Sequence, residues 1–421
     1  MKIVITGGGW AGCSAAYIAR MQGAEVTLLE RTDMLLGTGL VGGIMRNNGR
    51  FTATEEMIAM GGGEIFKIID ENCRHTGITF PGHKHASLYD IAKTPIAVGD
   101  YLKEIGVDVR LQERVTKADV EDGNILRVKT YIGSSYEADA FIDTTGTAGP
   151  MNNCSKYGNG CAMCVLRCPS FGGRTSLTGL CGIQERTGRK TDGQVGAMSG
   201  SCKLYKESLS SEILETLNRE GVAVVPLPEE FIENHLGIKA CQQYALKEFA
   251  ENIVLLDTGH AKLMTPYYSL EKLHKIPGFE NARYEDPYSG GRGNSMRFFD
   301  MAPRDNALQV QGIKNLFCAG EKAGLLVGHT EAIVTGVLAG YNCARFLKQQ
   351  PLLVLSRKTA IGEAIAYVNE EMQTEKGLGK KYTFSGSVLF EHMKELGLYE
   401  TNVAGIEENI KNEGLWQVFA S

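Results

Sequence analysis

The sequence predicts an α/β fold: a Rossmann-like dinucleotide-binding domain with a parallel sheet and helices, a second α+β lobe and a helical carboxyl-terminal tail. Residues 2–6 form an apolar run that leads directly into a glycine turn at 7–12 and then into helical composition at 14–22. Residues 313–319 read as a strand that meets another glycine turn near the other end of the chain. At 421 residues the chain is too long for one ordinary core, so we expect more than one lobe.

The bulk composition excludes several classes of protein. A formal net charge of -5 gives no general attraction for nucleic acid or anionic lipid, so a nucleic-acid partner would need a local basic patch. Residues 1–6 lack the pattern of a secretion signal, and no apolar run approaches the roughly 18 residues that span a bilayer. We expect a cytoplasmic protein without a membrane partner, whose 11 cysteines do not form a disulfide framework.

The first glycine turn has the spacing of a dinucleotide-binding motif. Gly7 permits the tight turn, Gly9 lets a pyrophosphate approach the backbone, and Gly12 lets the helix pack against the strand. The amino terminus of the following helix faces the phosphates. A second strand over 25–30 places Glu30 at its carboxyl end, 18 residues after Gly12, where a ribose-binding carboxylate belongs.

Sequence segments outside this first motif distinguish an FAD site from an NAD site. Residues 138–146 and 313–321 read as strands that end in small-residue turns, and small residues punctuate the helix after the second. The pattern resembles glutathione-reductase-type flavoproteins, most of all those related to the glucose-inhibited division protein A (GidA-like) family. The resemblance covers roughly residues 1–50, 96–150 and 290–345. It implies FAD contacts at Gly7, Gly9, Gly12, Glu30, Arg31, Val115, Gly146, Gly320 and Glu321.

These blocks divide the chain into three parts. We predict a discontinuous FAD-binding domain over 1–50, 96–150 and 305–350, and a substrate lobe over 51–95 and 151–304. A helical carboxyl-terminal region follows at 351–421. Residues 54–75 have helical periodicity, and the glycine-rich stretch 37–43 is expected to lie along the cofactor. We interpret His83 and His85 as part of a solvated turn rather than a metal site.

Four cysteines follow the turn at Gly146 with the spacing C-x6-C-x2-C-x3-C-P. They are Cys154, Cys161, Cys164 and Cys168. The last three, with their proline, resemble part of a bacterial ferredoxin motif, and thiolates are the natural ligands of such iron. The first spacing departs from that motif, so the fourth ligand of a [4Fe-4S] cluster could be Cys154, Cys181 or Cys202. There are two alternatives to a cluster. The cysteines could be redox-active thiols, with Cys164 and Cys168 as catalytic residues, or they could bind structural zinc.

Two glycine-rich turns carry arginines that suit an anionic substrate group. They are residues 172–174 and 288–294. Guanidinium binds carboxylate bidentately, so these arginines could hold such a group, and Arg292 is the preferred catalytic arginine.

These observations predict an FAD-dependent oxidoreductase that passes hydride or electrons through the flavin, with the cysteines as an electron relay or redox thiols. NAD(P)H is a candidate donor, the partner is a small molecule or a redox protein, and a homodimer is compatible with the sequence. The alternative, implied by the resemblance, is a flavin- and folate-dependent enzyme that modifies uridine in tRNA or rRNA. The acidic balance and the short, mixed-charge tail disfavour nucleic acid without excluding it.

Overall fold

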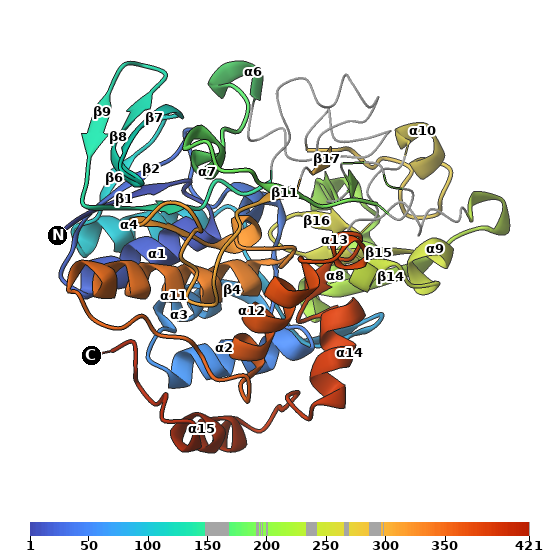
Figure 1. The fold of residues 1–421 in the computed structure, drawn as a ribbon. Helices are drawn as coiled ribbons and strands as arrows, with labels where there is room; N and C mark the ends of the chain where they lie inside the picture. The colour runs from blue at the N-terminus through green and yellow to red at the C-terminus, as the bar shows by residue number, and fades with distance from the viewer. Residues whose placement is uncertain are drawn as a thin grey trace.

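We analysed a computed structural model of the chain. It describes residues 1–147, 168–190, 201–232, 242–264, 269–285 and 299–420, together with 193, 195, 197–198 and 296–297. Figure 1 shows the arrangement of the elements.

The first domain is built on a parallel sheet of five strands in the order β19-β10-β1-β2-β6. Ile5 of β1 pairs with Ile142 of β10 on one side and with Leu28 of β2 on the other, so the carboxyl ends of these strands share one edge. The predicted Rossmann-like fold is confirmed. The strands are β1 (Lys2–Thr6), β2 (Glu25–Leu29), β6 (Asp108–Arg110), β10 (Ala140–Asp143) and β19 (Leu316–Cys318).

Two helices from opposite ends of the chain pack closely beside this sheet (Figure 1). They are α1 (Trp10–Met21) and α11 (His329–Leu347). A Cβ on Gly336 would lie 2.4 Å from the carbonyl oxygen of Ala11, and one on Gly340 would lie 2.4 Å from that of Ala15. The small residues of α11 therefore allow the two backbones to touch, which places the start of α11 beside the glycine turn.

A three-stranded antiparallel meander and α4 complete the first domain. Asn315 joins the meander to the main sheet, because its side-chain amide donates to the carbonyl of Ile125 while its Oδ1 accepts from the Ile125 N–H. The elements are α4 (Thr94–Glu104), β7 (Val115–Glu121), β8 (Asn124–Thr130) and β9 (Ser135–Glu137).

Residues 44–89 form two helices and a small antiparallel sheet of order β3-β5-β4. The helical periodicity predicted for 54–75 ends earlier, because α3 stops at Glu71 and Cys73 begins a strand. The elements are β3 (Ile44–Met45), α2 (Gly49–Ala59), α3 (Glu64–Glu71), β4 (Cys73–Phe80) and β5 (His83–Tyr89).

The second lobe contains a four-stranded antiparallel sheet of order β13-β16-β15-β14 with its own buried apolar core. Its strands are β13 (Cys202–Leu204), β14 (Val222–Pro226), β15 (Asn252–Asp257) and β16 (Ala261–Leu263). The helices of this region are α6 (Cys168–Phe171), α7 (Leu177–Leu180), α8 (Ser211–Glu220), α9 (Glu248–Glu251) and α10 (Leu270–Leu273). Two short pairs join β11 (Arg186–Thr187) to β18 (Asp300–Met301) and β12 (Ala197–Met198) to β17 (Met296–Arg297).

The tail is mostly helical, as predicted, and it folds back on the first part of the chain. Figure 1 shows the red carboxyl-terminal helices beside α2, and both α12 and α15 contact that helix. Its elements are α12 (Ala360–Glu371), α13 (Glu375–Leu378), β20 (Tyr382–Thr383), α14 (Ser387–Glu395) and α15 (Val403–Asn412). The domain boundaries given above remain a prediction. Within the described ranges, no helix has the length and apolar character needed to cross a bilayer.

Candidate active site

One pocket gathers residues from four separate stretches of the first domain and from the second lobe. From the first domain it is lined by the glycine turn, the end of β2, residues 144–147 and residues 319–321. Ser201, Gln243, Tyr244, Lys262 and Met264 line it from the second lobe. The pocket lies at the carboxyl edge of the parallel sheet, where ligands of open α/β sheets bind.

The three glycines of the first turn have three different surroundings. Gly7 has a φ of +108°, and a Cβ there would lie 2.4 Å from the carbonyl oxygen of Thr144. A Cβ on Gly12 would lie 1.8 Å from the carbonyl oxygen of Gly7, which makes Gly12 a packing residue that does not line the pocket. A Cβ on Gly9 would meet none of the described atoms within 4 Å. Gly9 therefore borders open space at the start of α1, where a phosphate could approach the backbone.

Glu30 is buried at the end of β2 and faces the same turn. One of its carboxylate oxygens accepts a hydrogen bond from the Gly8 N–H (2.7 Å), and the other accepts from the Thr32 N–H (2.8 Å). These contacts fix the carboxylate at the pocket wall, beside Arg31. A carboxylate oxygen has two lone pairs, so Glu30 can still accept from a ribose hydroxyl.

The opposite wall comes from two strand ends that lie side by side. Gly146 and Gly320 both adopt positive φ, +64° and +66°, so each chain can turn sharply after its strand. The Thr147 hydroxyl donates to the carboxylate of Glu321, which joins the two turns. Below them, burial acts to raise the pKa of the Asp143 carboxyl, but Lys322 and hydrogen bonds from Thr178 outweigh it and the pKa is lowered. These contacts hold the two turns against the sheet.

Aromatic side chains surround the amino terminus of α11 at the pocket. The Tyr89 hydroxyl donates to the carbonyl of Gly39 (2.9 Å) and lies 3.4 Å from Nδ1 of His329. The ring centroids of Trp10 and His329 lie 6.0 Å apart. A Cβ on Gly42 would lie 1.8 Å from the His329 ring, so this glycine leaves the room that His329 occupies.

A buried lysine lines the pocket from the second lobe. Lys262 is 6% exposed, and its ammonium donates to Ser201 Oγ (2.7 Å) and to the carbonyl of Val41. These two contacts hold the Lys262 ammonium at the pocket wall, where its positive charge can attract an anionic ligand.

The floor of the pocket includes an ion pair between two helices. Arg50 of α2 lies 3.2 Å from the carboxylate of Glu331, which is fully buried on the first turn of α11. The same carboxylate accepts hydrogen bonds from the Thr383 hydroxyl (2.7 Å) and the Phe384 N–H (2.9 Å). Arg50 and Glu331 thus connect α2, α11 and β20 beneath the pocket.

His83 does not lie in a solvated turn, contrary to the prediction. It is 2% exposed on β5, because its ring stacks on Phe80 (4.7 Å between centroids). Its Nε2 lies 3.1 Å from the carbonyl of Gln243 and its Nδ1 lies 3.0 Å from the side-chain amide of Asn47. Since a carbonyl only accepts, Nε2 donates and Nδ1 accepts, and burial lowers the pKa of this imidazole to about 3.

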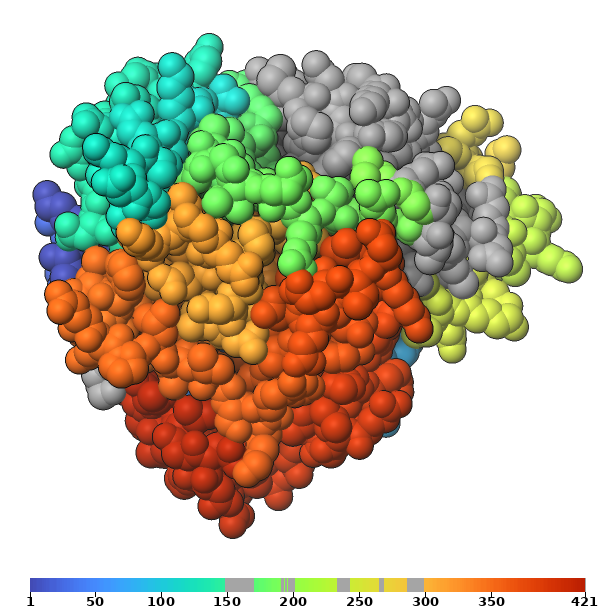
Figure 2. Space-filling view, viewed as in Figure 1, coloured from blue at the N-terminus to red at the C-terminus, as the bar shows by residue number. Residues whose placement is uncertain are grey.

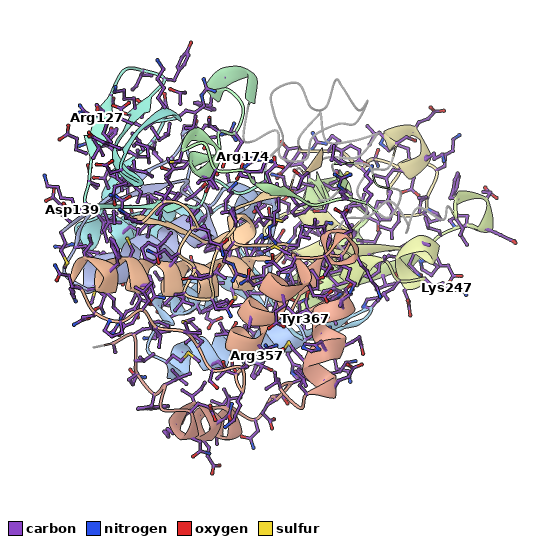
Figure 3. The ribbon with its side chains drawn as sticks, viewed as in Figure 1. Arg127, Asp139, Arg174, Lys247, Arg357 and Tyr367 are labelled. Carbon is purple, nitrogen blue, oxygen red and sulfur yellow. The ribbon has the colours of Figure 1, made fainter. Side chains whose placement is uncertain are left out.

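Eight of the nine predicted FAD-contacting residues line this one pocket. They are Gly7, Gly9, Glu30, Arg31, Val115, Gly146, Gly320 and Glu321. Gly37, Thr38 and Gly42 of the predicted cofactor loop line it as well. Arg174, labelled in Figure 3, also lies on the pocket wall and belongs to one of the two predicted arginine turns.

Several predicted site residues lie outside the part of the chain that the structure describes. Cys154, Cys161, Cys164 and Arg292 belong to this group, and of Cys168 only its place at the start of α6 is described. Among the described residues, no group of three or more His, Cys, Asp or Glu is arranged to hold a metal ion. Cys181, a proposed fourth ligand, has a pKa raised to about 12 by burial and by Asp143.

Sequence reasoning missed most of the pocket's polar groups. Arg50, Lys262, His329, Gln243 and Tyr244 carried no recognisable motif, because they come from four separate elements. The one available signal was position, since His329 directly follows Gly328, which lies eight residues after Gly320.

Comparison with known proteins identifies relatives that match most or part of the chain. It is 24% identical over 418 residues to the tRNA uridine 5-carboxymethylaminomethyl modification enzyme MnmG of Desulfotalea psychrophila, covering 85% of this chain and 62% of that protein. A shorter match, 35% identical over 103 residues, is to the methylenetetrahydrofolate–tRNA-(uracil-5-)-methyltransferase TrmFO of Dictyoglomus thermophilum. That match covers 24% of this chain and 22% of the other. The chain thus spans less than two thirds of the MnmG protein.

The fold is similar to that of GidA from Aquifex aeolicus, with a TM-score of 0.64 and 17% sequence identity over 98% of this chain and 76% of the other. The family model of glucose inhibited division protein A matches residues 2–265 and 258–351. This match takes in both glycine turns, the pocket and most of the second lobe. The chain belongs to the glucose inhibited division protein A family of FAD-dependent flavoproteins.

Proposed function

We propose that this protein binds FAD in the pocket described above and uses it to modify a uridine of tRNA. The observation that carries the proposal is the convergence of the glycine turn, Glu30 and the two strand-end turns at Gly146 and Gly320 on one pocket. The names of the relatives supply the substrate class, since both describe modification of tRNA at uridine or uracil.

The residues of the first domain fit an extended dinucleotide. The open space at Gly9 and the start of α1 would receive the pyrophosphate, and Glu30 would hold a ribose. Gly320, Glu321 and the start of α11 would meet another part of the same cofactor. When bound, FAD supplies transfer of a hydride or an electron pair, with NAD(P)H as the proposed source of electrons.

The second-lobe side of the pocket suits a nucleobase. Tyr244 offers an aromatic face, and single-stranded bases are commonly bound by stacking on such side chains. Gln243 and Lys262 on this side, together with His329 at the start of α11, offer groups that can hydrogen-bond to the carbonyl and N–H edges of a uracil. A uridine would have to leave its stack to reach them, as bases do in other base-modifying enzymes.

This proposal reverses the preference drawn from composition. The net charge of -5 and the short tail argued against nucleic acid. The match to MnmG over 85% of the chain argues for it more strongly than bulk charge argues against it, because bulk charge says nothing of local surfaces. We therefore place tRNA above a small-molecule substrate.

The test is direct modification. Unmodified tRNA is incubated with the protein, FAD, NAD(P)H and methylenetetrahydrofolate, and its nucleosides are analysed by mass spectrometry. We expect a uridine of increased mass that requires both the protein and the reductant. Unchanged nucleosides, together with no binding of tRNA at low salt, would overturn the proposal.

The cysteine segment remains a second proposal, for an electron relay beside the flavin. Its two ends both lead to the pocket, since Thr147 lines the pocket and Arg31 donates to the carbonyl of Gly172. Cys154 follows Thr147 by seven residues in the sequence.

Metal analysis tests this second proposal. Anaerobically purified protein should contain iron and acid-labile sulfide, and Cys164→Ser should lose both while keeping FAD. Iron content that is absent, or unchanged in the variant, would contradict a cluster at Cys154, Cys161, Cys164 and Cys168. Loss of turnover by Cys164→Ser in a protein that contains no iron would favour the redox-thiol alternative.

A further inference from the structure

Basic side chains gather on one face of the molecule in a protein that is acidic overall. We define the basic patch as Arg186, Arg189, Lys190, Lys376, Lys380 and Lys381. The first three lie on and just after β11, and the others lie on α13 and just before β20. Figure 2 shows residues near 190, in green, beside the orange-red surface of the region around 380.

Hydrogen bonds to the backbone hold the two segments together. The Arg189 N–H donates to the carbonyl of Leu378 (2.8 Å), and the Arg186 guanidinium donates to the carbonyl of Met372 (2.9 Å). The Lys381 ammonium also donates to the carbonyl oxygen of Arg189 (3.4 Å). The clustering is therefore set by the fold, although the two segments are about 190 residues apart in the sequence.

The patch carries an excess of positive charge. Residues 186–190 contain no acid, and residues 371–381 contain only Glu371 and Glu375. Glu371 pairs with Lys380 (2.7 Å) and accepts from the Tyr382 hydroxyl (2.9 Å). Arg189 and Lys376 are exposed and Lys190 is partly exposed, and within the described part of the chain none of the three forms an ion pair with a carboxylate.

The patch borders the pocket through two short connections. The Thr187 hydroxyl donates to Asp300 (2.8 Å), and the same carboxylate lies 3.4 Å from the guanidinium of Arg174 on the pocket wall. On the other side, the N–H of pocket-lining Val327 donates to the carbonyl of Tyr382 (2.8 Å), which directly follows Lys381.

We infer that the basic patch binds the phosphate backbone of the RNA whose base enters the pocket. The inference rests on the proposed function. Phosphate contacts by Lys and Arg supply most of the affinity of such complexes and set the register of the strand. A lipid surface fits less well, because Val195, which pairs with Arg189, is the one exposed large apolar side chain among the described residues of 186–198 and 371–381.

The test is a charge-reversal variant, Arg189→Glu/Lys190→Glu/Lys376→Glu, measured by filter binding to unmodified tRNA over a range of salt. The control is Lys103→Glu/Lys117→Glu/Lys275→Glu, which reverses three basic side chains outside the patch. Bound FAD absorbance shows that each variant keeps its fold. Vesicles containing phosphatidylserine serve as a second anionic probe.

The inference predicts that the patch variant binds tRNA at least tenfold more weakly at low salt. Its log–log salt slope should fall by about one for each phosphate that the protein no longer neutralises. The control should match the wild type.

Four outcomes would contradict the inference or its basis. Equal weakening in both triple variants, or wild-type binding by the patch variant, would overturn the patch while leaving the proposed function intact. Wild-type protein that retains FAD but binds no tRNA would instead refute the proposed function. Vesicle binding that depends on the patch, with tRNA binding unchanged, would overturn the inference in favour of lipid.

Discussion

Glu331, on the first turn of α11, forms an ion pair with Arg50 of α2 at 3.2 Å, under the pocket and out of contact with solvent. The pair fixes the amino end of α11 to a helix that packs against the tail. It thereby couples the position of His329 to elements remote from the glycine turn.

Neutralising this carboxylate should cost substantial stability. Glu331→Gln leaves the Arg50 charge buried without its partner, and we expect a loss of about 3 kcal/mol in the free energy of unfolding. Glu370→Gln is the control, because the Arg357–Glu370 pair is about half exposed and should contribute less than about 1 kcal/mol. Denaturant unfolding measures both, and similar losses would contradict the role given to Glu331.

The glycine turn predicts opposite consequences at two neighbouring positions. Gly9→Ala adds a methyl group into open space at a φ of -73°, so the apoprotein should keep its stability while FAD affinity falls at least tenfold. Gly12→Ala forces a Cβ to within 1.8 Å of the Gly7 carbonyl and should destabilise the apoprotein itself. Thermal unfolding of FAD-free protein and FAD titration separate the two effects. Unchanged FAD affinity in Gly9→Ala would be inconsistent with a phosphate at this turn.

Acid should weaken the fold through His83. Its pKa is about 3 in the folded protein against 6.5 for the free group, so the folded state binds fewer protons. The buried neutral ring therefore contributes its full stabilisation above pH 6.5. As pH falls below this value the contribution is lost, and the free energy of unfolding is about 2 kcal/mol lower at pH 5. His83→Gln keeps one donor and one acceptor without a titrating ring. Unfolding measured at pH 7 and pH 5 should therefore show a smaller decrease for the variant, and parallel decreases would contradict the assignment.

Lys262 should tune the flavin. A positive charge on the pocket wall favours the more electron-rich reduced cofactor. Lys262→Met should weaken binding of reduced FAD relative to oxidised FAD by about tenfold, which corresponds to a midpoint potential about 30 mV lower. Lys262→Arg, which keeps the charge, is the control in a spectroelectrochemical titration. Equal flavin midpoint potentials for Lys262→Met and the wild type would contradict the role given to Lys262.

The sequence predicted the first domain well because its signals are local. The strand, turn and helix of the glycine motif follow one another directly in the sequence. Gly7, Gly9 and Gly12 are each required there for a different steric reason. The second-lobe side of the pocket could not be found in this way. Lys262 and Tyr244 meet there only through tertiary packing. His83 illustrates the same limit, because its neighbours Pro81 and Gly82 indicated a turn while Phe80 and Tyr244 bury its ring.

Hydrogen–deuterium exchange on the apoprotein and on the FAD-bound protein tests the placement of the cofactor most directly. FAD should slow exchange in three remote segments at once, residues 7–13, 30–44 and 319–330, because all three meet at the pocket. Protection confined to one of them, or found only elsewhere in the chain, would contradict the site.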